Sequence, residues 1–302
     1  DRDPVKGFLL AAAGSALLAV NPVVGKYCLA DAVGFNAVTF AFLWMSLASV
    51  YTLGLLVTKR NLRRFVVPAR AITSLVVIGV MTGAVQFLGW LALVYLDPAF
   101  ASFLQRFVPV FTILAGVIVL GERLYRFEVA AVLVMVAGGA LSTIAEWRIV
   151  AIGVGLAMTS YLIVSAQRLI IKLSVRDVEP MVVNFWRTFG GTVSLGLIAG
   201  LTGRLDFAAG AARWRALLFG ALIGPCLGVF LLVSSYRHWE LSRSTLVMMA
   251  QPLITFPLAY LFLGTVPSRW QLAGGLVILA GAFWLVWAHG RRHRLNSAAD
   301  AV

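Results

Sequence analysis

The sequence predicts an all-α membrane protein of ten transmembrane helices, arranged as two inverted five-helix repeats. Of its 302 residues, 61% are hydrophobic and only 12% are charged, whereas soluble domains average about 45–50% apolar and about 25% charged residues. Ten windows are apolar enough to cross a bilayer, and part of the second half repeats the first half at an offset of 143 residues. This composition excludes an ordinary soluble enzyme, because the ten windows leave little chain for a water-soluble domain.

The ten windows are recognised by the near absence of Asp, Glu, Lys and Arg, because a spanning helix needs about 20 apolar residues. Eight windows contain no such charge, and two contain one arginine each, Arg106 and Arg187. No small-residue cleavage site follows the first window, so we expect a retained helix there rather than a signal peptide. In chain order the windows are 7–25, 32–58, 71–96, 98–121, 129–145, 149–167, 180–203, 216–236, 244–268 and 270–290.

Lysine and arginine residues determine the predicted orientation, since cations in short loops stay on the cytoplasmic side. With both termini inside, sixteen of the 25 Lys and Arg residues lie in inner segments, six in outer loops and three within or beside windows. Topology therefore explains most of the net charge of +13, and we expect no nucleic-acid partner. The expected location is a bacterial inner membrane, with both termini cytoplasmic and membrane lipid around a monomer or a homodimer.

An internal repeat relates the two halves of the chain. Residues 98–141 align without a gap on 241–284, and the ten identical positions include Pro109 with Pro252. Each half holds five windows, so the second half crosses the membrane in the opposite sense, and such folds hold their substrate near the midplane between the halves. The expected parts are a first repeat at 1–148, a second repeat at 149–290 and a basic cytoplasmic tail at 291–302.

The repeated segments resemble a known family. The stretches YLDPAFASFLQRFVPVFTILAGVIVLGERL and HWELSRSTLVMMAQPLITFPLAYLFLGTV, each followed by a helix that ends near Gly138 or Gly281, are similar to the paired EamA domains of the drug/metabolite transporter superfamily. The resemblance covers nearly the whole chain. It implies a transporter whose substrates belong to a wide list: amino acids and related metabolites, drugs, nucleotide-linked sugars and metal-chelating metabolites.

The two arginines inside windows are the strongest functional signal. A charge at bilayer depth costs about 2.5–3.5 kcal/mol even on the most lenient scale, and it usually faces the bundle interior or water. Arg106 lies about 12 Å from the outer boundary and Arg187 about 10 Å from the inner one at the helical rise per residue. We expect both to receive the carboxylate or phosphate of a solute. The alternative is that each binds open backbone carbonyls or extends toward the headgroups.

Prolines inside the windows indicate cavity-lining helices. A proline removes the hydrogen bond to the carbonyl four residues earlier, and an open carbonyl at membrane depth needs protein or cavity water as a partner. Simple kinks that serve packing are the alternative. The expected helix breaks are Pro22, Pro109 and Pro252.

Polar and aromatic residues at helical spacing complete the expected cavity. Glycines four residues apart are expected to let helices pack closely, namely Gly79 with Gly83 and Gly220 with Gly224. The expected substrate-binding residues are Arg106, Arg187, Gln105, Gln86, Trp90, Tyr161, Trp186, Met248, Gln251 and Asn21.

The sequence offers little to catalysis. Cys28 and Cys226 are far apart and have no zinc-like spacing, and no nucleophile is accompanied by a base and an orienting group. We therefore expect no enzyme, no catalytic residue, no metal and no cofactor. The predicted function is export of a small carboxylate-bearing, amino-acid-like solute by alternating access. An intramembrane enzyme or a protein that handles lipid headgroups is the main alternative, and a non-transporting helical scaffold is another.

Overall fold

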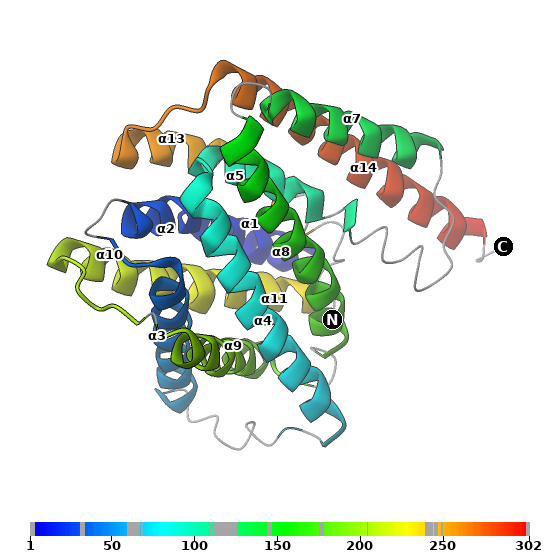
Figure 1. Cartoon of the computed structure of the whole chain (residues 1–302). Coiled ribbons are helices and arrows are strands. Elements are labelled where there is room, and N and C mark those ends of the chain that lie inside the picture. The colour runs from blue at the N-terminus through cyan, green and yellow to red at the C-terminus, as the bar shows by residue number, and fades with distance from the viewer. Residues whose placement is uncertain are drawn as a thin grey trace.

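The part of the chain that the structure describes is built from helices alone (Figure 1). The structure is a computed structural model, and no strand occurs in its described residues. Each of the ten predicted windows contains helix, which confirms the all-α membrane fold. The described residues are 4–30, 34–58, 67, 69–108, 110–111, 126–143, 147–174, 178–203, 205–238, 244, 247–248 and 250–299.

The described helical elements divide equally between the two halves of the chain, and α8 begins at Trp147, two residues before the predicted start of the second repeat. The first repeat contains α1 (Pro4–Leu18), α2 (Asn21–Leu29), α3 (Ala37–Thr58), α4 (Ala69–Tyr95), α5 (Pro98–Leu104), the 3₁₀ turn η2 (Gln105–Phe107) and α7 (Arg126–Thr143). The second repeat contains α8 (Trp147–Ser174), α9 (Pro180–Thr202), α10 (Ala211–Ala221), the π-helix η3 (Leu222–Gly228), α11 (Val229–His238), α13 (Gln251–Leu263) and α14 (Arg269–Ala299). Helix α14 continues through most of the predicted basic tail.

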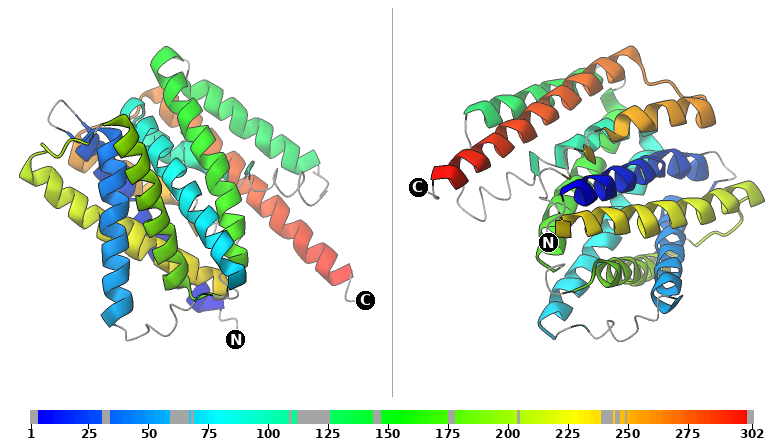
Figure 2. Two further views of the ribbon diagram at one scale, coloured as in Figure 1. Left: turned by 60° about the horizontal axis from the view of Figure 1, so that its bottom comes forward. Right: turned by 180° about the vertical axis from the view of Figure 1, so that it is seen from behind.

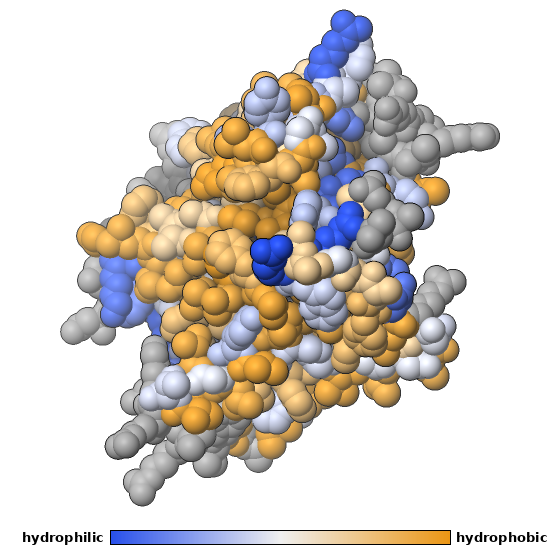
Figure 3. Space-filling model, turned by 90° about the vertical axis from the view of Figure 1, so that its left-hand side faces the viewer, coloured by the Kyte–Doolittle hydropathy of each residue, from blue (hydrophilic) through white to orange (hydrophobic). Residues whose placement is uncertain are grey.

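Several of the helices have the length and composition of membrane spans. Among the described residues, five stretches meet both criteria, and three shorter helices are also apolar. Large hydrophobic side chains lie on the outside, such as Leu261 and Phe262, and hydrophobic residues cover much of the face in Figure 3. Such a surface suits lipid rather than water. The five stretches are Val5–Leu29, Ala37–Thr58, Ala71–Tyr95, Ala151–Ile171 and Ala211–His238.

Two of the windows are interrupted at a proline. The first window divides into α1 and α2, and Pro22 occupies the first turn of α2, where a missing N–H is tolerated best. The window 216–236 contains Pro225 inside the π-helix η3. Pro252 likewise lies in the first turn of α13, whereas Pro109 lies outside the described residues.

The helices of the two repeats contact one another in a symmetric pattern: where a helix of the first repeat packs on one of the second, the equivalent helices also pack on each other. Helix α7 lies beside α14, α5 beside α13 and α3 beside α9 (Figures 1 and 2), and each pair joins equivalent windows of the two repeats. Helix α4 packs on α8, and the reciprocal pair is α11 and η3 on α1. This reciprocity is the pattern of a pseudo-two-fold axis between inverted repeats. The start of α1 and the end of α14 lie at the same end of the bundle (Figure 2, left).

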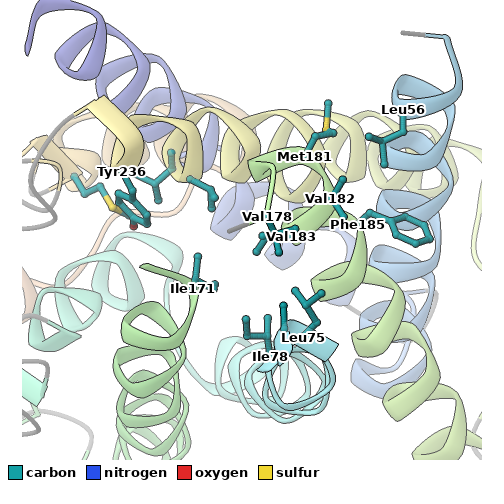
Figure 4. Packing of buried hydrophobic residues seen from close by; sticks show 14 residues of the cluster. Leu56, Leu75, Ile78, Ile171, Val178, Met181, Val182, Val183, Phe185 and Tyr236 are labelled. Atoms are coloured by element: carbon teal, nitrogen blue, oxygen red, sulfur yellow. The ribbon is translucent and has the colours of Figure 1, made fainter. Parts of the chain in front are cut away.

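Two buried clusters lie at opposite ends of the bundle. The Ile78 cluster takes Leu75 and Ile78 from α4, whereas the Trp44 cluster takes Trp90 and Leu93. At 1.5 Å per residue these two parts of α4 are about 20 Å apart. The Ile78 cluster (Figure 4) comprises Leu56, Ala71, Leu75, Ile78, Ile171, Val178, Met181, Val182, Val183, Phe185, Leu232, Val233, Tyr236 and Met248. The Trp44 cluster comprises Cys28, Phe35, Phe40, Ala41, Trp44, Met45, Trp90, Leu93, Leu195, Leu217 and Ala221.

Glycines bring α4 and α9 into backbone contact. A Cβ atom added to Gly79 would lie 2.7 Å from the Cα of Gly190, and one added to Gly83 would contact the side chain of Ser194. Gly220 and Gly224 have a different role, since a Cβ added to either would contact side chains of the first repeat rather than a partner backbone. Only the first pair therefore brings two helix backbones together.

We predict that Gly79→Ala lowers the thermal stability of the protein. The new methyl group must push α4 away from α9, and overpacking of this kind costs about 1–3 kcal/mol. Gly155→Ala is the matched control, because nothing lies within 4 Å of a Cβ placed there. Thermal unfolding in detergent, followed with a thiol-reactive dye that reaches the buried Cys28 and Cys226 on unfolding, measures both variants. Equal midpoints for the two would contradict the contact.

Candidate solute-binding site

A cavity lies between the two repeats. Its volume is ≈ 240 Å³, and its wall combines residues of α1 to α5 and η2 with residues of α8, α9, η3, α11 and α13. Along α4 its lining residues Val85, Gln86 and Gly89 lie between the Ile78 cluster and the Trp44 cluster. The cavity therefore occupies the middle of the bundle, with a hydrophobic cluster toward each end.

Arg106 is held behind the cavity wall. The α5 helix that precedes it begins at Asp97, whose Oδ1 accepts from the backbone N–H of Ala99 at 2.8 Å, as an N-cap does. The helix tightens into η2 at Gln105–Phe107, and the side chain of Arg106 is only 3% exposed. It does not belong to the lining residues of the cavity.

The guanidinium group of Arg106 uses four of its five donors. Nε donates to the Ser102 carbonyl at 3.2 Å and Nη1 donates to the Met248 carbonyl. Nη2 donates to Gln105 Oε1 at 2.9 Å and to Gln251 Oε1 at 2.7 Å. Proline at 252 removes the helical donor to the Met248 carbonyl, so Arg106 replaces that donor. Its hydrogen bonds thus match the carbonyl-binding alternative rather than an oxyanion receptor.

Arg187 lines the cavity, and only two of its three guanidinium nitrogens donate hydrogen bonds to described residues. Its Nε donates to Asn184 Oδ1 at 3.0 Å, and its Nη2 donates to the carbonyl of Pro225 at 3.1 Å. Asn184 Nδ2 donates to the carbonyls of Pro225 and Cys226 at 3.0 and 3.2 Å. Nη1 of Arg187 makes no hydrogen bond with the described residues. Arg187 therefore supports the π-helix, lines the cavity and keeps one nitrogen, Nη1, without a partner among the described residues.

Arg168 is a cavity residue that sequence reasoning did not select. It lines the cavity from α8 and makes no hydrogen bond or ion pair with the described residues. Tyr161, Ser165 and Arg168 follow one another at i, i+4 and i+7, so this helical stripe was the signal that pointed to it.

The opposite part of the cavity has an aromatic wall. Trp44 and Trp90 both line it, with ring centroids 5.2 Å apart and ring planes at 71°. Phe40 packs edge-on against Trp90 at 4.8 Å. A Cβ on Gly220 would contact the ring of Trp44, so this glycine makes room for the aromatic wall.

Two polar groups of the wall lack partners. Asn21 Oδ1 and Trp90 Nε1 are buried and make no hydrogen bond in the described structure. Tyr161, by contrast, donates to the carbonyl of Ala101 at 3.1 Å. Buried polar groups are normally paired, so the wall contains one acceptor, Asn21 Oδ1, and one donor, Trp90 Nε1, that no described protein group uses.

The structure brings most of the expected binding residues together, but not all. Arg106 is kept out of the wall by its four hydrogen bonds. Trp186 points elsewhere, packing against Phe185 and Phe189 with ring centroids 6.0 and 6.1 Å apart. Pro22 also lines the cavity, and Pro252 does not. The expected residues in the wall are Arg187, Gln105, Gln86, Trp90, Tyr161, Met248, Gln251 and Asn21.

The residues that sequence reasoning missed include Arg168, Asn184 and Pro225. Asn184 precedes Arg187 by one helical turn, and Pro225 interrupts a charge-free window just as Pro22 does. Both signals are visible in the sequence.

The described part of the chain contains no group of three or more His, Cys, Asp or Glu side chains that could hold a metal ion.

Comparison with known proteins identifies the family. The EamA-like transporter family matches residues 5–144 and again residues 151–287. The chain belongs to this family. The match confirms the resemblance of the two repeats to paired EamA domains, and this EamA protein is a membrane transporter of small molecules. No curated protein matches the chain.

A solved structure shares the fold of this EamA protein. It is described as "Crystal structure of protein", has a TM-score of 0.66 and is 18% identical in sequence. The likeness covers 95% of this chain and 98% of the other. At 18% identity the likeness shows that the two proteins share a fold. It does not show that their cavities are lined by the same residues.

We predict that Arg106 stabilises this EamA protein and that Arg168 does not. Arg106→Met leaves the Met248 carbonyl and two glutamine oxygens without their donor, which costs at least about 3 kcal/mol at about 1–3 kcal/mol per buried group. Arg168→Gln removes no hydrogen bond to the described residues and stays within about 0.5 kcal/mol of the wild type. Thermal unfolding in detergent checks the order of the two variants. An unchanged midpoint for Arg106→Met would contradict the assignment.

Proposed function

We propose that this protein is a secondary transporter of a small organic anion, such as a carboxylate-bearing, amino-acid-like metabolite. One observation carries the proposal: the described wall of the cavity contains two arginines and no acidic residue. Arg168 has no hydrogen-bond partner among the described residues, and Arg187 keeps Nη1 free of one. A cleft lined by one sign of charge attracts the opposite sign, and a guanidinium group matches the geometry of a carboxylate.

The position of the cavity supports transport by alternating access. The solute site lies between the repeats, with the Ile78 cluster toward one end of the bundle and the Trp44 cluster toward the other. The proposed path to either side passes one of these clusters. In inverted-repeat transporters the two halves rock around a central site, and this cavity occupies that central position.

The proposed direction is export. By the cation distribution, the ends of α3 and α8 that carry Leu56 and Ile171 face the cytoplasm, so the Ile78 cluster closes the cytoplasmic end. An anion that leaves a cell with a negative interior gains about 2.3 kcal/mol per charge per 100 mV. Membrane potential therefore suffices as the driving force for outward movement.

The alternative of an intramembrane enzyme has no comparable support. Serines line the cavity, but no histidine or carboxylate accompanies them among its described lining residues. A serine needs an adjacent base to act as a nucleophile. The described wall therefore favours binding and release over chemistry.

We predict that Arg168→Gln weakens anion transport by about 10-fold or more, since a hydrogen bond to a charged group contributes about 1.5–3 kcal/mol. The measurement is uptake into proteoliposomes across a panel of anionic, zwitterionic and cationic solutes. Arg215→Gln is the control, because it removes the same charge from an exposed position on α10 that does not line the cavity. A preference of the wild type for cations, or equal anion uptake in both variants, would overturn the proposal.

We predict electrogenic transport without proton coupling. No carboxylate or histidine is among the described residues that line the cavity, and intramembrane proton relays use such groups. At 100 mV a monovalent anion of fixed charge should reach a gradient of about 50-fold. Flux at a clamped potential should not change with external pH. Proton movement that accompanies the anion, detected with an internal pH dye, would refute the uniport scheme.

A further inference from the structure

Arg106 acts on two side chains that line the cavity. Its Nη2 lies 2.9 Å from Gln105 Oε1 and 2.7 Å from Gln251 Oε1. A guanidinium group only donates hydrogen bonds, whereas a carboxamide has one accepting oxygen and one donating NH₂ group. The oxygen of each glutamine must therefore face Arg106. Each NH₂ group is directed elsewhere.

The two glutamines differ in the hydrogen-bond partner of the NH₂ group. Gln251 Nε2 donates to the carbonyl of Ser15 at 3.4 Å. Gln105 Nε2 makes no hydrogen bond with the described residues, and Gln105 belongs to the cavity wall. Gln105 thus keeps a neutral donor that no described group uses, on a residue of the wall that also contains Arg168.

The orientation of Gln105 is imposed by a group that cannot easily move. Arg106 is 3% exposed and is also bonded to the carbonyls of Ser102 and Met248. Met248 and Gln251 belong to the second repeat, whereas Gln105 and Arg106 belong to the first. Contact between the two repeats therefore sets the direction of the Gln105 donor.

We propose that Arg106 is a positioning residue that holds Gln105 as a hydrogen-bond donor to the anionic group of the solute. This inference rests on the proposed function, in which Arg168 supplies the charge. Gln105 adds selectivity, because its NH₂ group favours a carboxylate over a neutral group of the same shape. Without Arg106 the carboxamide can turn over and present its oxygen, which repels an anion.

The experiment compares phenylacetate with phenylacetamide, two probes of the same shape that differ in charge and suit an aromatic wall. Binding to the full-length protein in detergent is measured by equilibrium dialysis for wild type, Gln105→Met, Arg106→Gln and the double variant. Gln271→Met is the control, since this glutamine caps the start of α14 and does not line the cavity.

We expect Gln105→Met to reduce the preference for phenylacetate over phenylacetamide by about 5-fold or more, because the carboxylate loses a stronger hydrogen bond than the amide carbonyl does. Arg106→Gln should reduce it similarly although Gln105 is intact, and the double variant should lose no more than Gln105→Met alone. Such non-additivity is the signature of two residues that act through one interaction. Additive losses of preference, or an unchanged preference in either folded single variant, would refute the positioning role.

A second variant keeps the test decisive if Arg106→Gln does not fold. Gln105→Glu retains an acceptor for Arg106 but replaces the NH₂ group with an oxygen. We expect a folded protein whose phenylacetate affinity falls about 10-fold or more, with phenylacetamide binding much less affected. Unchanged phenylacetate binding in this variant would overturn the inference.

The outcomes separate this inference from the proposed function. If Arg168→Gln loses phenylacetate and the Gln105 variants do not, only the role of Arg106 and Gln105 fails. If the Gln105 variants lose the preference and Arg168→Gln does not, the assignment of Arg168 as the charge receptor fails. Wild-type protein that binds neither probe, or both equally, overturns the two proposals together.

Discussion

A backbone carbonyl that loses its helical donor inside a bilayer has no water to bind, and this constraint organises the centre of the molecule. Where α1 and α2 separate, the carbonyl of Ala19 accepts from Thr255 at 2.9 Å. Arg106 binds the carbonyl of Met248, and Arg187 binds a carbonyl of the π-helix η3. Two of these three contacts join the first repeat to the second. At two of the helix interruptions, hydrogen bonds to the open carbonyls thus also hold the two repeats together.

The two reciprocal helix pairs around the cavity are built differently. Helices α4 and α8 are continuous, and Ser160 Oγ donates to the carbonyl of Val85 at 3.1 Å while Gln167 Nε2 donates to Thr82 Oγ1 at 2.6 Å. The reciprocal pair, α1 and α2 with α10, η3 and α11, is interrupted on both sides. One wall therefore consists of unbroken helices, and the wall across from it has carbonyls that bind side chains. The sequence repeat does not predict this difference, because the aligned segments 98–141 and 241–284 do not include these four windows.

The fold could be read from the sequence to the level of helices and repeats. A bilayer accepts only long apolar helices with internally satisfied backbones, so eight runs without charge and two runs with a single arginine located the ten windows. Helix interruptions were partly predictable, since proline acts locally: Pro22 was expected to break its window and does. The π-helix at Pro225 was not expected, although the same argument applies to it. Its geometry depends on donors from α9, which lie about forty positions away in the chain.

The candidate site was predicted less completely than the fold. Residue type and helical spacing identified polar side chains at membrane depth, and most of them line one cavity. The neighbours Gln105 and Arg106 show the limit, because adjacent helical residues point about 100° apart and nothing local decides which one faces the cavity. The acceptor at position 248 and the glutamine at 251, both from the other repeat, hold Arg106 behind the wall. Sequence alone determined that cations lie inside the membrane-spanning region without acids beside them in the chain. Only the tertiary structure decided which arginine lies behind the wall and which arginines line the cavity, since the hydrogen-bond acceptors that hold Arg106 come from distant helices.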